Sequence, residues 1–287
     1  MHPLEKKLTV VSLKRKKKLG EKITAVTAYD FPTARVASDA GIDLILVGDS
    51  LGMVLHGQSN TLKVTMDEMI YHTRLVASAN PLSLVVADMP FGSFHCDPKD
   101  AVANAIRFMK EGGAEAVKLE GGEKRYSVIE AIINAEIPVM GHLGLTPQSV
   151  HSLGGFKIQG KLKKNAQDIL QQAKELEKLG VFAIVLESIP LELAQQITAS
   201  ISIPTIGIGA GKYCDGQILV FHDLVGLTRS YLPKFVRQYA DIYSAIHGAL
   251  TLYITDVQQG NFPGETESFS QKEKPRKELN DETAQNS

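Results

Sequence analysis

Short apolar runs that recur along the chain constrain its fold more than any other feature of the sequence. Each run is rich in Val, Ile and Leu, which is typical of strands buried on both faces of a parallel sheet. Amphipathic segments with helix-capping residues lie between the runs, for example at 65–79, 97–113 and 165–181. The runs are KITAVTAY, LILVGD, LSLVVAD, AEAVKLE, IPVMGH, AIVLES, IPTIGIG and, less clearly, QILVFHD.

Alternating strands and helices admit two architectures, an open doubly wound sheet or a closed barrel of eight units. The spacing favours the barrel. From Asp49, after the second run, to Gly209, in the seventh, there are 160 residues over five intervals. This spacing is close to the roughly 30 residues per unit of a barrel of about 250 residues. A dinucleotide-binding sheet needs a GxGxxG motif after its first strand, and TAYDFPTA has no glycine there.

We therefore predict an α/β fold, a (β/α)8 TIM barrel that forms a single domain over 23–260. Residues 1–22 are expected to form an N-terminal helical extension, and residues 232–260 to add extra C-terminal helices. Residues 261–287 are polar and almost free of large apolar side chains, so a disordered tail is expected there.

The composition argues against several classes of function. A formal net charge of −1 over 287 residues gives no general attraction to nucleic acid. No run of about 18 apolar residues is present, so we expect no membrane span. Cys96 and Cys214 form no CxxC motif, and we expect a reducing, cytoplasmic setting. The basic cluster KRKKK at 14–18 is interpreted as a solvated helix face.

Ionisable side chains end five consecutive apolar runs. In barrel enzymes the carboxyl ends of the strands face the active site. Any one of these residues could be a turn former or a helix cap, and Asp49 after LILVG is the plainest example. Five in succession favour a functional site, because Glu and Lys are poor turn residues. The residues are Asp49 with Ser50, Asp88, Lys118 with Glu120, His142, and Glu187.

Three of these side chains are carboxylates that we expect to converge on a cation. Lys118 and Glu120 are two residues apart on one strand, so both should point into the barrel mouth. With Asp49 and Asp88, Glu120 supplies hard oxygen ligands, which suit Mg²⁺ better than Zn²⁺. A 2-oxo acid can chelate such an ion through carboxylate and ketone oxygens, and the metal then acidifies the carbon next to the ketone.

Glu187 is the candidate proton acceptor. It lies among apolar residues in AIVLESIP, and an apolar wall raises the pKa of a carboxylate toward useful base strength. His142 has two open interpretations, a catalytic group or a hydrogen-bonded structural histidine. The glycines of 206–211 could offer backbone N–H groups to an anion, although glycines also mark tight turns. His222 is interpreted as structural.

Several motifs occur in a fixed order between about residue 20 and about residue 240. They are TAYD, VGDSLGMVLHG, TLKVTMDEMIYHT, ADMPFGSF, VKLEGG, GHLGLTPQS, GGFKIQG, LESIP and IPTIGIGAG. In this combination the chain resembles the ketopantoate hydroxymethyltransferase (3-methyl-2-oxobutanoate hydroxymethyltransferase) family. One departure is FPGETESFS, where Glu267 stands in place of a histidine that the family often has.

The resemblance implies a barrel of the phosphoenolpyruvate/pyruvate type that uses Mg²⁺. The implied reaction transfers a hydroxymethyl group from 5,10-methylenetetrahydrofolate to 3-methyl-2-oxobutanoate, giving 2-dehydropantoate on the route to pantothenate and coenzyme A. The reaction would proceed by formation of an enolate followed by an aldol-type addition. The resemblance also implies a homo-oligomer, commonly a homodecamer. Carried over by motif, it assigns the metal to Asp49, Asp88 and Glu120, keto-acid contacts to Asp49, Ser50, Asp88 and Lys118, and proton acceptance to Glu187.

Two rival interpretations stay open at this point. The chain could be another Mg²⁺ barrel enzyme, a lyase or decarboxylase that acts on a different 2-oxo acid. The carboxylates alone do not exclude this alternative, and the motif string argues against it. A catalytically silent barrel that serves as a binding scaffold would need neither the acid cluster nor the isolated Glu187.

Overall fold

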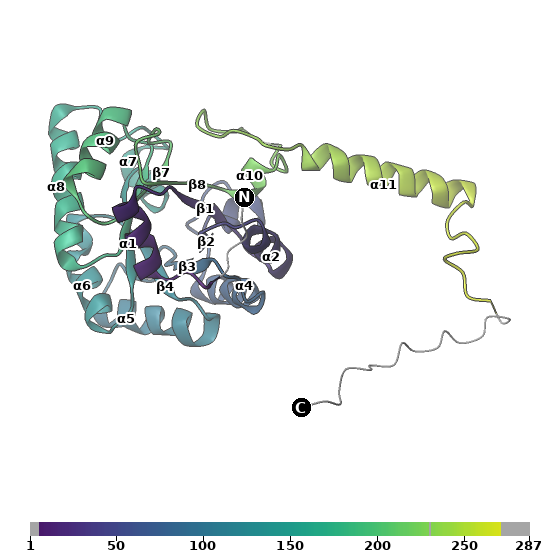
Figure 1. The fold of residues 1–287 in the computed structure, drawn as a ribbon, viewed down its shortest axis with the longest axis horizontal. Helices are drawn as coiled ribbons and strands as arrows, with labels where there is room; N and C mark the ends of the chain where they lie inside the picture. The colour runs from purple at the N-terminus through teal and green to yellow at the C-terminus, as the bar shows by residue number, and fades with distance from the viewer. Residues whose placement is uncertain (1–5, 230, 271–287) are drawn as a thin grey trace. The chain divides into compact units, whose positions relative to one another are not determined.

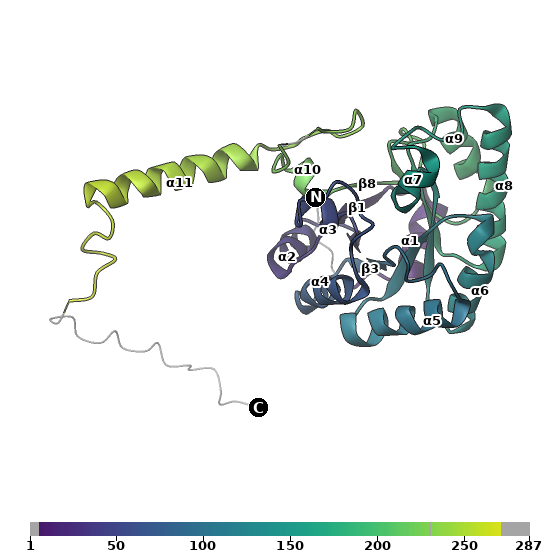
Figure 2. The ribbon, with the colours of Figure 1, turned by 180° about the vertical axis from the view of Figure 1, so that it is seen from behind.

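Eight parallel strands close into a barrel in chain order, which confirms the predicted (β/α)8 fold. The computed structural model describes residues 6–229 and 231–270. Figures 1 and 2 show helices α4, α5, α6 and α8 outside the strands. The strands are β1 (Ile23–Thr27), β2 (Leu44–Val47), β3 (Leu84–Asp88), β4 (Ala116–Glu120), β5 (Val139–Gly144), β6 (Ala183–Glu187), β7 (Thr205–Ile208) and β8 (Gly216–Leu219).

Helices connect the strands where the sequence predicts them. The predicted capping box at Thr65 is present, since Thr65 N donates to the Glu68 carboxylate at 2.7 Å and Thr65 Oγ1 accepts from Glu68 N. Asp97 caps the next helix through Lys99 N. The α-helices are α1 (Val10–Leu19), α2 (Phe31–Asp39), α3 (Leu51–Val54), α4 (Met66–Ser78), α5 (Pro98–Arg107), α6 (Tyr126–Asn134), α7 (Val150–Leu153), α8 (Lys163–Leu179), α9 (Leu191–Ser200), α10 (Phe221–Leu224) and α11 (Ile242–Gln259).

Alternate residues of each strand face different layers, and β4 shows this most clearly. Val117 and Leu119 belong to the core between the strands and the outer helices, whereas Ala116 belongs to the apolar cluster inside the barrel. Lys118 and Glu120 continue the inward-facing row of Ala116. The same row therefore begins apolar at the amino end of the strand and becomes charged at its carboxyl end.

Helix α1 closes the amino-terminal end of the barrel. Leu13 is fully buried in the interior cluster. Lys16 Nζ lies 2.5 Å from Asp43 Oδ1, and Lys17 Nζ lies 2.9 Å from Asp215 Oδ2. The interpretation of KRKKK as a solvated face is therefore wrong for these two lysines, because they reach carboxylates at the starts of two strands.

The described residues divide into two compact units, with the boundary between residues 240 and 241. Helix α11 belongs to the second unit, whereas residues 232–240 form no helix, so the helices expected over 232–260 are confirmed only from residue 242. The expected division at residues 22 and 260 stays a prediction, and the tail beyond residue 270 lies outside the described residues. Among the residues that the structure describes, no helix combines the length and apolar composition needed to cross a membrane.

Candidate active site

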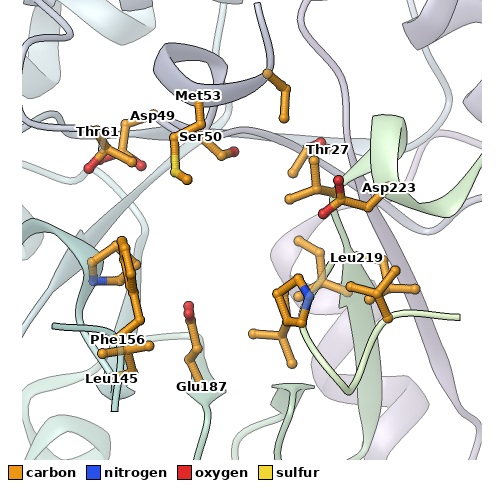
Figure 3. A pocket seen from close by; sticks show the side chains of 18 of the residues that line it. Thr27, Asp49, Ser50, Met53, Thr61, Leu145, Phe156, Glu187, Leu219 and Asp223 are labelled. Atoms are coloured by element: carbon orange, nitrogen blue, oxygen red, sulfur yellow. The ribbon is translucent and has the colours of Figure 1, made fainter. Parts of the chain in front are cut away.

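A cavity of about 1050 Å³ opens at the carboxyl ends of the barrel strands. Every site residue predicted from the sequence lines it, and Figure 3 shows Asp49, Ser50 and Glu187 around the hollow. The predicted residues brought together here are Asp49, Ser50, Asp88, Lys118, Glu120, His142 and Glu187.

The register of the parallel strands places these side chains next to one another. Asp88 on β3 pairs with Lys118 on β4, and Glu120 on β4 pairs with His142 on β5. Glu187 ends β6, which pairs along β5 up to Gly144. Because the carboxyl ends of parallel strands meet at one rim, residues far apart in sequence form one continuous cluster.

Lys118 is the centre of this cluster. Its Nζ lies 2.8 Å from Asp88 Oδ1 and 3.3 Å from His142 Nδ1. Burial lowers the pKa of Lys118, but the surrounding carboxylates of Asp88, Glu120 and Asp49 outweigh burial, and the net pKa is raised. The lysine is therefore a permanent cation at the site.

The carboxylates around Lys118 are costly to ionise. Burial raises the pKa of Asp49, opposed by Lys118, and burial raises the pKa of Asp88 to about 7. Burial likewise raises the pKa of Glu120 well above its usual range, and the neighbouring carboxylates add to this rise. In the described part of the chain, Lys118 is the only lysine or arginine that forms an ion pair with these groups.

Asp49 contacts the cluster through its side chain. Gln148 Nε2 donates to Asp49 Oδ2 at 2.9 Å, and Asp49 N lies 3.4 Å from Asp88 Oδ2. The next residue, Ser50, begins the turn into α3, and its Oγ lies 2.8 Å from Tyr29 Oη. The carboxylate of Asp49 thus faces the cavity, which favours the interpretation as a ligand over that as a turn former.

Gln148 is a site residue that the sequence analysis missed. Its Nε2 also donates to Met89 O at 2.9 Å, and its backbone N–H donates to Glu120 Oε2 at 3.0 Å. Gln148 therefore joins two of the predicted metal carboxylates, Asp49 and Glu120, and is itself buried. It lies inside the motif GHLGLTPQS, but it neither titrates nor ends a strand, which were the criteria used to select residues.

Glu187 and His142 form a second contact in the cavity. His142 Nε2 lies 3.2 Å from Glu187 Oε2. Burial and the charge of Lys118 hold the pKa of His142 well below its usual range, so the ring is neutral. The Lys118 ammonium can only donate, so His142 Nδ1 accepts and the ring proton lies on Nε2, toward Glu187. Burial raises the pKa of Glu187 to about 7, close to the strength of a base that works at neutral pH.

The chemistry of the donors fits a hard divalent cation. Among the residues that the structure describes, no three His, Cys, Asp or Glu side chains form a ready-made metal centre. Asp49, Asp88 and Glu120 instead share Lys118 and Gln148 as partners. A bound divalent cation would favour the ionised form of these three carboxylates, whose pKa values burial raises, and all their donor atoms are oxygens, as Mg²⁺ prefers.

Comparisons with known proteins identify relatives of the whole chain. A 3-methyl-2-oxobutanoate hydroxymethyltransferase of Thermoanaerobacter sp. (strain X514) is 56% identical over 274 residues, 96% of this chain and 100% of that protein. The protein of the same name from Geobacter metallireducens is 55% identical over 267 residues, 93% of this chain and 100% of that protein.

Solved structures share the fold at low sequence identity. A phosphonopyruvate hydrolase complex with oxalate and Mg²⁺ has a TM-score of 0.58 at 14% identity, over 91% of this chain and 93% of that one. A 2,3-dimethylmalate lyase of the PEP mutase/isocitrate lyase superfamily has a TM-score of 0.57 at 17% identity, over 93% and 92%. These neighbours share the (β/α)8 barrel fold with this chain. The model of one protein family, ketopantoate hydroxymethyltransferase, matches residues 7–265. The chain belongs to the ketopantoate hydroxymethyltransferase family.

Proposed function

We propose that this protein transfers a hydroxymethyl group from 5,10-methylenetetrahydrofolate to 3-methyl-2-oxobutanoate, giving 2-dehydropantoate. Beyond family membership, one observation carries the proposal. A buried cluster of three carboxylates around one lysine shares its cavity with Glu187, a carboxylate whose pKa is about 7. A cation-binding site beside a base of neutral strength is what removal of a proton next to a ketone requires.

The acid cluster is the proposed binding site for Mg²⁺ and the keto acid. Asp49 and Asp88 would hold the metal, with Glu120 as the third carboxylate. When bound, the ion would draw electron density from the ketone and so stabilise negative charge on the enolate oxygen. Lys118 neutralises the keto acid, and the Ser50 hydroxyl, held by Tyr29, contacts it.

Glu187 is proposed to accept the proton from C3 of the keto acid. At neutral pH about half of a carboxyl with a pKa near 7 is ionised, so the group is basic enough to take the proton and can also release it. His142 Nε2 lies 3.2 Å from this carboxylate, a close approach without a formed hydrogen bond. We therefore propose His142 as a positioning residue for Glu187.

The carbon–carbon bond forms between C3 of the enolate and the one-carbon unit. One water molecule is consumed, because the new hydroxyl oxygen comes from neither substrate. Both bonds from the methylene carbon to the folate nitrogens break. The C3 proton and the two protons of water then appear on those two nitrogens and on the new hydroxyl, so the products are tetrahydrofolate and 2-dehydropantoate.

A homo-oligomer and a cytoplasmic location belong to the same proposal. Large hydrophobic side chains of α11 are exposed over its length in this single chain, among them Ile246, Leu250 and Tyr253, which supports contact with another copy. Cys96 and Cys214 are both free thiols, which supports a reducing compartment.

Proton exchange tests this proposal. 3-Methyl-2-oxobutanoate is incubated with the protein in D₂O, with and without Mg²⁺, and the C3 proton signal is followed by NMR. We expect loss of the signal that depends on Mg²⁺ and 2-dehydropantoate formation when 5,10-methylenetetrahydrofolate is added. No exchange with or without tetrahydrofolate, together with turnover of another 2-oxo acid such as oxaloacetate, would overturn the proposed substrate.

A further inference from the structure

The cavity is much larger than a keto acid requires. Its volume of about 1050 Å³ lies at the upper end of the range of roughly 300–1,000 Å³ that drug-sized ligands occupy. The acid cluster and Glu187 line only one part of it. The opposite wall is formed by the carboxyl ends of β8 and β1 and by α10, which contribute Thr27, Leu219, Val220, His222 and Asp223. This wall, the β8 wall, contains none of the residues proposed to contact the keto acid.

Asp223 is the only carboxylate of the β8 wall. Figure 3 shows its side chain across the hollow from Asp49 and Glu187. Thr228 Oγ1 donates to Asp223 Oδ1 at 2.7 Å and so fixes the carboxylate. Among the described residues, Asp223 Oδ2 accepts no hydrogen bond and no lysine or arginine pairs with Asp223. One acceptor oxygen of a fixed carboxylate thus lies in the cavity without a partner.

The surroundings of Asp223 fix its position. Phe221 N donates to Thr27 Oγ1 at 3.0 Å, which ties α10 to the end of β1. Burial lowers the pKa of His222, the neighbouring residue, so its imidazole is neutral at pH 7. Leu219 supplies an apolar surface below the carboxylate, as Figure 3 shows. A flat ring with hydrogen-bond donors on one edge fits this combination of an apolar surface and a fixed carboxylate.

A chain of contacts links the β8 wall to the keto-acid site. The rings of His222 and Tyr29 lie 5.6 Å apart, and Tyr29 Oη is 2.8 Å from Ser50 Oγ. Tyr29 is 1% exposed, so its contacts with His222 and Ser50 are held in the core beside the cavity. A ligand on the β8 wall would therefore lie beside the keto acid within one cavity.

We propose that the β8 wall binds the pterin ring of the one-carbon donor, with the carboxylate of Asp223 accepting from the 2-amino group and N3–H. These two adjacent donors of a 2-amino-4-oxopyrimidine edge match the two oxygens of a carboxylate. The inference rests on the proposed function. It explains why the cavity is larger than the keto acid. It also places the one-carbon unit of the donor beside C3 of the keto acid.

The anionic end of the donor is excluded from this wall. The glutamate tail of a folate carries carboxylates, which the carboxylate of Asp223 repels, whereas the cations Arg229 and Lys234 line the cavity outside the β8 wall. The pterin end is uncharged and carries hydrogen-bond donors that the carboxylate of Asp223 can accept. The orientation with the pterin inside and the tail toward solvent follows from this difference.

Asp223→Asn tests the role of the carboxylate directly. Asparagine keeps the size of the side chain and can still accept from Thr228. It removes the charge and presents an amide in place of an acceptor. We expect calorimetry to show about 30-fold weaker binding of tetrahydrofolate, the usual loss for a hydrogen bond to a charged group. Asp39→Asn makes the same chemical change on the exposed face of α2 and should leave the affinity unchanged.

A comparison of ligands tests the same contact without any substitution. The 2-desamino-2-methyl analogue of tetrahydrofolate lacks the amino group proposed to face Asp223. We expect the unchanged protein to bind this analogue at least tenfold more weakly than tetrahydrofolate. In Asp223→Asn the difference should shrink to about twofold, because the partner of the amino group has been removed.

The outcomes separate this inference from the proposed function. Two results would overturn the pterin site alone, provided that the unchanged protein shows metal-dependent C3 exchange. One is that the unchanged protein binds tetrahydrofolate and its 2-methyl analogue equally well. The other is that Asp223→Asn still discriminates fully between the two ligands. Absence of both C3 exchange and tetrahydrofolate binding in the unchanged protein overturns the proposed function and the inference with it. Loss of discrimination in the variant, with C3 exchange intact in the unchanged protein, supports both.

Discussion

The two ends of the barrel hold buried or partly buried carboxylates in opposite circumstances. At the carboxyl end, the upper set shares one lysine, Lys118. At the amino end, each member of the lower set has a lysine of its own from the N-terminal segment. The upper set is Asp49, Asp88, Glu120 and Glu187, and the lower set is Asp43, Glu115 and Asp215.

The lower set is built into the backbone of the barrel. Asp43 accepts from Thr24 N at 2.9 Å, and Asp215 accepts from Thr205 N at 2.8 Å, so the same arrangement occurs twice. Glu115 accepts from Val85 N at 3.0 Å. Each acid directly precedes a strand, contacts the neighbouring strand and pairs with a lysine. Charge, hydrogen bonds and position are all satisfied within the chain.

The upper set lacks this balance of charge and hydrogen bonds, and the difference indicates which end of the barrel binds a ligand. Burial raises the pKa values of Asp88 and Glu120, and the positive charge of Lys118 offsets only part of this rise. An arrangement that lowers stability on its own is typical of a site completed by a ligand. The lower set stabilises the fold, whereas the upper set is the proposed cation site.

The largest effect is expected from Glu187→Gln in the upper set. Removing the proposed base should slow C3 proton exchange by about 10³-fold, within the range for general acid–base groups. Keto-acid binding, measured by calorimetry, should change less than threefold, because glutamine keeps the size of the side chain. Exchange at the normal rate in this variant would assign the proton transfer to another residue.

In the lower set, Asp215→Ala should affect stability and spare the chemistry. The change leaves Lys17 and Thr205 N without their acceptor, and breaking a largely buried pair should cost about 3 kcal/mol of unfolding free energy. For a chain of this size, thermal unfolding should begin several degrees lower, with C3 exchange retained below that temperature. Asp39→Ala, which breaks an exposed pair with Arg35, is the control and should cost less than about 1 kcal/mol. Equal losses in both variants would contradict the comparison.

Magnesium should stabilise the protein through the upper set, and more so at high pH. The pKa of Asp88 rises from 3.8 to about 7 on folding, so the metal-free protein loses stability as pH rises through this interval. At 100 times its dissociation constant, Mg²⁺ should add about 2.7 kcal/mol at pH 8. At pH 5.5 the gain should be much smaller, because the ion must displace protons. Thermal unfolding at both pH values measures this difference, and Asp88→Asn should abolish most of it.

The smallest expected effect is the pH dependence of C3 exchange. Glu187 accepts a proton only when ionised, and its pKa is about 7. With saturating Mg²⁺ and keto acid, the rate should rise about tenfold between pH 6 and pH 8. A rate that falls over this interval would require a protonated group in place of the base.

Local sequence specified the fold and most of the site. Apolar runs gave the eight strands, and caps such as Thr65 and Asp97 gave helix starts, because these signals act within a few residues. Parallel strands in a barrel expose their carboxyl ends on one rim, so strand-ending residues such as Lys118 and Glu187 could be assigned to one site before any contact was known. The strand periodicity and the barrel topology were together sufficient to predict this part of the site.

The tertiary structure decided the contacts that bridge long stretches of chain. Gln148 reaches Asp49 across 99 residues, and Lys17 reaches Asp215 across 198. Neither contact leaves a local pattern, because an amide or a lysine in a helix looks the same in sequence whether it faces solvent or a buried carboxylate. Asp223 likewise resembled an ordinary residue after a strand until barrel closure placed β8 beside β1. Closure brings together groups whose chemistry depends on burial and on partners far along the chain, and burial is a property of the whole fold.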